Sequence, residues 1–471
     1  MSLNNLNQTN NTHYLMLSCL VASLGGLLFG FDTAVISGNV GMIEEFFDLT
    51  KLQKGWFTSS ALIGCIIGAA IAGNLGDRFG RKPVLIVSAF LFFISAFFSM
   101  IPSSFTLLVP ARIIGGVGVG IASVLSPMYI SEFSPAKIRG RLVALYQLSI
   151  VVGILLAYFS NSMLQSNALN GIAQSSGEGW WHKIFYSEVW RAMFGMEMIP
   201  ALLFFLLLLI VPESPRWLIQ KGAVDKGLDI LCKIGGEKDS SSEYNKIKEL
   251  LNENKGSLKD LLKPGLITAL IVGVGLSVFG QLTGINVIIY YGPDILKDAG
   301  FELDSALQFQ VILGFINLFF TIVAIFFIDK VGRRPLLLGG MGFLVITLLA
   351  AGLLFTTVNS NSLALVVVLG LYVACFAFSI GAVIWVLTPE IYPNYVRGRA
   401  MSIAVFANWT TNAMAAYLFP WYVDRFGMHT GFFTFAAICF AATIFFWKYI
   451  PETKGKSLEE IEQMWTNRSK K

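Results

Sequence analysis

The chain has 471 residues, of which 55% are hydrophobic and only 13% are charged, and its mean hydropathy is +0.67. A soluble domain carries about 25% charged residues, so the composition excludes an ordinary water-soluble protein and indicates a chain that folds in lipid. The formal net charge of +5 is modest. We attribute it to membrane topology and expect a lipid bilayer, and no nucleic acid, as partner.

About twelve apolar stretches could each form a helix of the roughly 20 residues that cross a bilayer. They lie near 14–38, 55–74, 83–101, 107–131, 140–164, 192–211, 265–291, 307–328, 336–357, 362–388, 399–422 and 431–450. The polar start, Met1–Asn7, lacks the basic stretch of a cleaved signal peptide, so we expect the first span to remain as an anchor. The fold class predicted is an all-α membrane protein.

Basic residues set the orientation of such helices, because loops rich in Lys and Arg stay on the cytoplasmic side. With an inward N-terminus, 27 of the 34 Lys and Arg residues fall in inner loops and the tail, and six fall in outer loops. We therefore expect a multi-pass protein of a plasma or bacterial inner membrane, with both termini in the cytoplasm.

Three motifs occur twice, in the same order in the two parts of the chain, which marks an internal duplication. The pairs are Gly76–Pro83 with Asp329–Pro335, Glu132–Arg141 with Glu390–Arg399, and Pro212–Ser214 with Pro451–Thr453. The duplication predicts two six-helix bundles, residues 1–213 and 264–450.

The remaining segments are polar. Residues 214–263 are rich in lysine but carry apolar residues at helical spacing, so we expect short amphipathic helices docked on the cytoplasmic face. The alternative is a solvated linker. In the tail, residues 451–471, Ser457 is followed by Glu460, which is the spacing of a capping box and predicts another short helix.

Two ionisable side chains stand inside predicted spans, where charge is costly and functional by default: Asp32 and Arg112. If their helices pack together, the two can pair, and the carboxylate can load and release a proton during a conformational cycle. The alternative is a static salt bridge. The glycines at positions 115, 116, 118 and 120 lack the strand-then-helix context of a nucleotide loop, so we expect them to allow close helix packing.

Amide side chains gather mainly in the C-terminal half. An amide offers donors and an acceptor without charge, which suits a neutral polyhydroxylated ligand, and tryptophan can cover the apolar face of a sugar ring. The candidates are Gln147, Gln281, Asn286, Asn317, Asn408 and Asn412, with Trp385 and Trp409. The alternative is hydrogen bonding from helix to helix, for which Asn412 is the first candidate.

Spacing favours a broken helix at this site. Asn286 and Tyr290 are four residues apart and share a helix face, whereas Gln281 and Asn286 are five apart and diverge on a regular helix. Gly280 and Gly284 allow local unwinding that turns both amides inward, as in transporter sites built on interrupted helices.

The repeated hairpins place acids beside bases at the expected inner surface. Ion pairs between the two halves could hold an outward-open state and break on inward opening. The alternative, simple anchoring by positive charge, leaves the acids unexplained. The side chains concerned are Arg78, Arg81, Arg139, Arg333, Arg334 and Arg397 with Asp77, Glu132, Asp329 and Glu390.

Over about residues 14–460 the chain resembles the sugar porter branch of the major facilitator superfamily. The motifs that carry the resemblance are Gly76–Pro83, Arg112–Gly116, Glu132–Arg141, Pro212–Leu218, Gln281–Asn286, Asp329–Pro335, Glu390–Arg399 and Pro451–Gly455. The resemblance implies a transporter without metal or cofactor, not an enzyme. It matches Gln147, Gln281, Asn286, Asn317, Trp385 and Asn408 to sugar-contacting positions, with Trp409 beside them, and Tyr290 to an outer gate.

The segment Phe31–Thr33 resembles bacterial xylose–proton symporters, in which the residues matching Asp32 and Arg112 couple transport to protons. Facilitative glucose transporters typically carry Asn at the Asp32 position. The resemblance therefore favours proton-coupled import of a monosaccharide by alternating access. A facilitative uniporter is the alternative, and a sugar sensor is a further one, against which the short tail argues.

Two positions depart from the branch. Gly280 stands where the family usually has the first of two glutamines, which removes one expected sugar contact. Ala382 replaces a proline that usually follows Gly381, so the expected loosening of the helix before Trp385 rests on that glycine.

Overall fold

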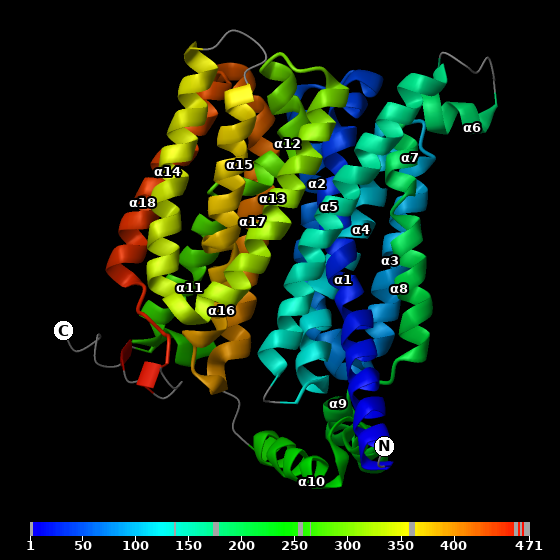
Figure 1. Cartoon of the computed structure of the whole chain (residues 1–471), viewed down its shortest axis with the longest axis vertical. Helices are drawn as coiled ribbons and strands as arrows, with labels where there is room; N and C mark the ends of the chain where they lie inside the picture. The colour runs from blue at the N-terminus through cyan, green and yellow to red at the C-terminus, as the bar shows by residue number, and fades with distance from the viewer. Residues whose placement is uncertain are drawn as a thin grey trace.

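The computed structural model describes residues 3–135, 138–172, 179–252, 258–263, 265–357, 363–455, 460–461 and 464–465. Within these residues every regular element is a helix. Most of the helices run side by side along the long axis of the molecule (Figure 1).

The first part of the chain forms one group of long helices. They are α1 (Leu3–Phe47), α2 (Lys51–Phe79), α3 (Arg81–Met100), α4 (Phe105–Phe133), α5 (Arg139–Ile172), α7 (Trp190–Gly195) and α8 (Met198–Ile210). A short helix α6 (Trp180–His182) and a π-helical turn (Lys183–Ser187) precede α7. We refer to this group as the N-half.

The second group, the C-half, packs beside the first (Figure 1). It consists of α11 (Leu266–Gln281), α12 (Ile285–Asp298), α13 (Leu303–Val331), α14 (Arg333–Thr357), α15 (Leu363–Phe378), α16 (Ile380–Glu390), α17 (Asn394–Phe426) and α18 (Met428–Tyr449).

Between the halves, α9 (Pro215–Gln220), α10 (Val224–Asn252) and a 3₁₀ turn (Leu258–Leu262) lie at one end of the molecule, which we call the α10 end (Figure 1). Ile219, Leu231 and Ile247 form a small apolar cluster of their own there. The expected helix cap at Ser457 lies outside the described residues, although Trp465 is buried and its indole N–H donates to the Ile391 carbonyl at 3.0 Å.

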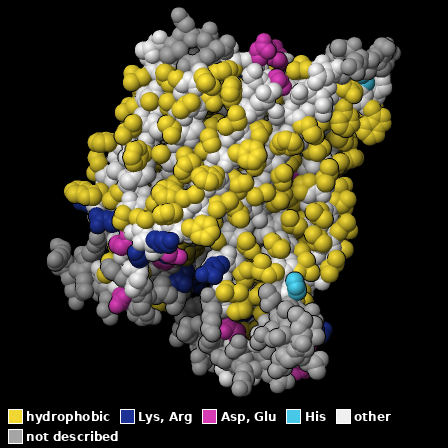
Figure 2. Space-filling view, in the orientation of Figure 1, with side chains coloured by type: hydrophobic (Ala, Val, Ile, Leu, Met, Phe, Trp, Pro, Cys, Tyr) yellow, Lys and Arg dark blue, Asp and Glu magenta, His cyan; other side chains and the backbone are white. Residues whose placement is uncertain are grey.

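The long helices suit a membrane. Eleven helical segments of the described chain are long and apolar enough to cross a bilayer. The helix α17 is continuous and equally long, but its sequence is less apolar and includes Asn408 and Asn412. Hydrophobic side chains cover the middle of the visible face, and charged ones gather towards its ends (Figure 2). Phe326 and Phe319 are 68% and 62% exposed, which is unfavourable in water and favourable in lipid.

Glycines bring the helices of the N-half close together, as the sequence predicts. A Cβ atom at Gly116 would lie 1.8 Å from the Ala61 carbonyl oxygen of α2, and one at Gly120 would lie 2.3 Å from that of Cys65. Only glycine fits at such a crossing, so the run after Arg112 is a packing surface between α4 and its neighbours.

Two of the expected continuous spans are interrupted, and a third is irregular. The predicted span 192–211 is confirmed as the segment Trp190–Ile210, with a local irregularity where α7 ends at Gly195 and α8 begins at Met198. The span 265–291 breaks between Gln281 and Ile285, where unwinding was expected. The span 362–388 breaks at Ser379, two residues before the expected Gly381.

Candidate functional site

A buried ion pair joins α1 and α4 in the N-half. Arg112 Nη1 donates to Asp32 Oδ1 at 2.6 Å, and the two side chains are 2% and 4% exposed. The guanidinium also lies over the Phe194 ring, 5.1 Å from its centroid. The sequence predicted this pairing if the two helices packed together, and they do.

A second buried carboxylate, Glu197, escaped the sequence interpretation. It is fully buried at the interruption between α7 and α8, close enough to Asp32 and Arg112 to interact with both charges. A second carboxyl group therefore adjoins the ion pair, on the side of Asp32. Glu197 is an acidic residue inside a predicted span, near its beginning, and this position is the signal by which the sequence could reveal it.

In the C-half, three of the predicted amides form a chain of hydrogen bonds. Asn286 Nδ2 donates to Gln281 Oε1 at 2.5 Å, and Gln281 Nε2 donates to Asn408 Oδ1 at 2.8 Å. Each amide keeps further donor or acceptor capacity. We call this group the amide chain.

The amide chain exists because α11 and α12 are not one helix. Gly284 has φ +91°, a left-handed conformation that only glycine adopts without strain. The interruption rotates Asn286 towards Gln281, which a regular helix would keep apart.

A small pocket adjoins Asn408. Its wall includes Trp385, which is 41% exposed, so a flat aromatic face and an amide border the same space. The remaining lining residues are Ser277, Ile384, Thr388, Met401, Ala404 and Val405.

Two predicted sugar ligands are not hydrogen-bonded to the amide chain in the described residues. Asn317 Oδ1 on α13 accepts from Thr321 Oγ1 at 3.5 Å, one turn along the same helix. Gln147 on α5 is half-buried. Within the described part of the chain, no hydrogen bond joins either residue to the amide chain.

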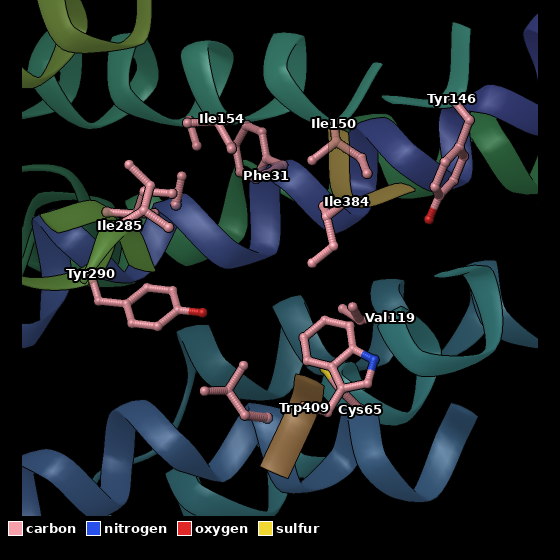
Figure 3. Packing of buried hydrophobic residues seen from close by; sticks show 14 of the residues in the cluster. Phe31, Cys65, Val119, Tyr146, Ile150, Ile154, Ile285, Tyr290, Ile384 and Trp409 are labelled. Carbon is pink, nitrogen blue, oxygen red and sulfur yellow. The ribbon is translucent and has the colours of Figure 1, made fainter. Parts of the chain in front are cut away.

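Asn412 bonds from helix to helix, as expected. Its Nδ2 donates to the Tyr290 hydroxyl at 3.0 Å, which ties α17 to α12. Tyr290 and Trp409 lie in one buried cluster with Phe31 and Val119 of the N-half (Figure 3). Trp409 and Phe29 of α1 are 5.4 Å apart between ring centroids, so the two halves touch beside the site.

The halves are joined at the end opposite α10. Lys54 Nζ of α2 lies 2.8 Å from Asp294 Oδ2 of α12 and 2.5 Å from Glu44 Oε2 of α1, and its side chain is 8% exposed. Lys297 adds a second pair between the halves, with Glu45 at 3.3 Å.

At the α10 end the predicted ion pairs form inside each half. Arg81 bonds Glu132 at 2.9 Å in the N-half, and Arg333 bonds Glu390 at 3.0 Å in the C-half. The two halves repeat a hydroxyl contact as well. Ser214 donates to Glu132, and Thr453 donates to Glu390, each at 2.6 Å.

The other predicted gate residues form no hydrogen bond or ion pair with the opposite half among the described residues. Arg139 reaches Glu243 of α10 at 3.5 Å, Arg397 donates to the Tyr392 carbonyl at 3.2 Å, and Arg78 lies over the Phe79 ring. Among the described residues at the α10 end, no ion pair links the two halves. This arrangement is the one expected after opening at that end; the pairing of the halves in the opposite state stays a prediction.

Comparison with known proteins fits this architecture. The family model described as sugar (and other) transporter matches residues 18–465. An arabinose–proton symporter of Bacillus subtilis is 41% identical over 96% of this chain and 95% of its own length. A D-xylose–proton symporter of Escherichia coli is 41% identical over 99% of both chains.

A solved structure resembles the fold equally well. The xylose transporter XylE of Escherichia coli, in a partially occluded inward-open conformation, matches with a TM-score of 0.82 and 39% identity, over 94% of this chain and 100% of that one.

Proposed function

Because the chain belongs to the sugar transporter family, we propose that it imports a monosaccharide together with a proton by alternating access. The observation that carries the proton coupling is the buried Asp32–Arg112 pair with Glu197 beside it. Arabinose and xylose, the sugars in the names of two relatives, are the first substrates to test.

The amide chain supplies the sugar site in this proposal. Gln281, Asn286 and Asn408 present donors and acceptors to sugar hydroxyls, and Trp385 covers the apolar ring face. Gln147, Asn317 and Trp409 would complete the site when the halves close around the ligand. No bond of the sugar is broken, so the protein acts as a carrier.

Asp32 would couple the proton to the movement of the halves. As a carboxylate it holds Arg112 in a charged pair; when it takes up a proton, the charge attraction between the two is lost. The proton leaves for the opposite side after the halves have moved, and the carboxylate pairs with Arg112 again. Because both side chains are buried, protonation of Asp32 would leave the Arg112 charge unpaired at a depth where such a charge is costly, which would favour movement of the halves.

Residues 1–213 and 264–450 would move as the two bodies of the transporter, with 214–263 connecting them and the tail 451–471 following the C-half. We assign the α10 end and both termini to the cytoplasm, because most basic residues lie there. Lys54 and Asp294, with Tyr290 beneath them, then close the outer side in this conformation.

Uptake into proteoliposomes with an acidic exterior tests the proposal. A gradient of one pH unit is worth about 1.36 kcal/mol, which supports roughly tenfold accumulation for one proton per sugar. Asp32→Asn should reduce accumulation to the equilibrium level while sugar exchange without a gradient persists. Asp304→Asn, an acid bonded to Gln308 at the outer end of α13, is the matched control.

The outcomes separate the alternatives. A wild-type protein that never exceeds equilibrium is a facilitative uniporter, and one that binds sugar without any uptake is a sensor. If Asp32→Asn accumulated sugar like the wild type, the coupling role of Asp32 would be wrong.

A further inference from the structure

Three buried polar atoms near Asp32 have no hydrogen-bond partner among the described residues. They are Ser95 Oγ, Ser99 Oγ and Arg112 Nε, whereas the Glu197 carboxyl lies within hydrogen-bonding reach of Asp32. Both serines and Glu197 are 0% exposed. A buried polar atom without a partner is costly, and native proteins satisfy such atoms with water that makes two to four hydrogen bonds.

The register of α3 against α4 places the two serines. Ser88 Oγ donates to the Gly118 carbonyl at 2.8 Å, which fixes the two helices side by side. A Cβ atom at Gly115 would lie 2.3 Å from Ser95 Oγ and 3.7 Å from Asp32 Oδ1, so Ser95 is a near neighbour of the ion pair. Ser99 follows one turn later on the same face of α3, nearer its outer end.

Some buried serines of the N-half bond within their own helix. Ser37 donates to the Ala34 carbonyl at 2.8 Å, and Ser60 donates to that of Phe57 at 2.6 Å. Ser95 and Ser99 make no such bond, and neither do Ser126 and Ser160. Of these four hydroxyls, that of Ser95 lies where α3 packs on α4 beside Asp32.

The junction between α7 and α8 lies beside the same end of α3. A Cβ atom at Gly195 would lie 2.9 Å from Met100 Sδ, so the junction that carries Glu197 packs on the outer end of α3. Arg191 donates to the carbonyls of Met100 and Pro102 and pairs with Glu188, which is 14% exposed. Polar groups thus continue from Asp32 to the outer surface.

We propose that Ser95, Ser99 and Glu197 hold a chain of buried water that carries protons between the outer end of α3 and Asp32. The route runs inside the N-half, apart from the sugar site, and rests on the proposed coupling role of Asp32. A proton enters from outside, passes along the water by exchange of hydrogen bonds, and forms an O–H bond on the Asp32 carboxylate. Release of this proton to the opposite side, after the halves have moved, leaves the carboxylate ionised again.

Changing the size of the side chains at positions 95 and 99 tests the water route. The double variant Ser95→Val/Ser99→Val fills the space, whereas Ser95→Ala/Ser99→Ala leaves room for water. In proteoliposomes we expect the valine variant to slow gradient-driven uptake tenfold or more, with the final accumulation and gradient-free exchange close to wild type. The alanine variant should stay within about threefold of the wild-type rate. Ser88→Val, on the same helix but bonded to Gly118, is the matched control for packing.

The readouts distinguish this proposal from the coupling role itself. Loss of Asp32 function lowers the final accumulation, whereas a narrowed route lowers only the rate of reaching it. Unchanged uptake in the valine variant would overturn the water route, and so would equal loss of exchange and uptake.

A measurement on the wild-type protein avoids folding defects. Radiolytic hydroxyl labelling modifies side chains that contact bound water. Phe194, fully buried beside Arg112, should be labelled, whereas Phe446, fully buried in the C-half, should not. Absence of label on Phe194 would exclude water beside the ion pair.

Discussion

At the scale of single residues, Gln281 is the centre of the proposed sugar site. It is the only member of the amide chain bonded to both others, accepting from Asn286 and donating to Asn408. Since the usual neighbouring glutamine is replaced by Gly280, Gln281 carries the recognition at this turn alone. A Cβ atom at Gly280 would meet Ile384 at 3.0 Å, so the missing side chain is replaced by close packing of α11 on α16.

Gln281→Ala should weaken sugar binding. The truncation removes the donor and acceptor that Gln281 would offer to the sugar hydroxyls, and a polar group of the bound sugar left without its partner costs about 1–3 kcal/mol. We expect the Kd, measured by calorimetry on purified protein, to rise about tenfold or more. Asn161→Ala removes a buried amide of the N-half that donates to the Val35 carbonyl, and should leave the Kd unchanged. A wild-type Kd for Gln281→Ala would remove the amide chain from the site.

At the scale of helices, several residues of the proposed site lie beside irregular helical positions, whereas Asp32, Arg112 and Asn408 lie inside continuous helices. The break at Gly284 forms the amide chain, the break at Ser379 precedes Trp385, and the junction of α7 with α8 carries Glu197. An interrupted helix frees backbone groups and turns side chains away from their regular positions.

Gly284→Ala should disturb the site without entering it. The residue needs a positive φ, which costs about 1–2 kcal/mol for a residue with a Cβ, and the new methyl group would lie 2.9 Å from the Phe435 ring. Sugar affinity should fall about tenfold in the same calorimetric assay. Gly339→Ala on α14, where a Cβ meets nothing within 4 Å, provides the control. Equal affinities for both variants would show that the break does not position Asn286.

At the scale of the whole molecule, contacts between the halves are asymmetric. Lys54 and Asp294 connect them at the end opposite α10, whereas the ion pairs described at the α10 end stay inside each half. The conformation is therefore closed at the end opposite α10, which is the outer end in the proposed orientation, and the fold resembles a XylE structure described as inward-open. Opening at that end has to separate Lys54 from Asp294.

Gly55→Leu should favour the outward-open state. A Cβ atom at Gly55 on α2 would lie 2.0 Å from the Tyr417 carbonyl of α17, so a larger side chain holds the outer ends apart. Spin-label distances across the outer end should lengthen, and uptake should fall at least tenfold while sugar still binds from outside. Gly73→Leu on the same helix meets nothing within 4 Å and should transport normally. Unchanged distances in Gly55→Leu would contradict the outer contact.

Composition, apolar run length and the internal repeat were sufficient to predict the fold class and to single out Asp32 and Arg112, because lipid forces every backbone group into helices and makes each charge inside them conspicuous. The broken helix at Gly284 was also predictable, since glycine marks unusual backbone conformations. Only the tertiary structure decided that α1 and α4 bring Asp32 to Arg112, that Glu197 lies beside Asp32, and that Lys54 and Asp294 join the halves at the end opposite α10. Those relations depend on how distant helices pack, and residue spacing along one helix carries no information about its neighbours.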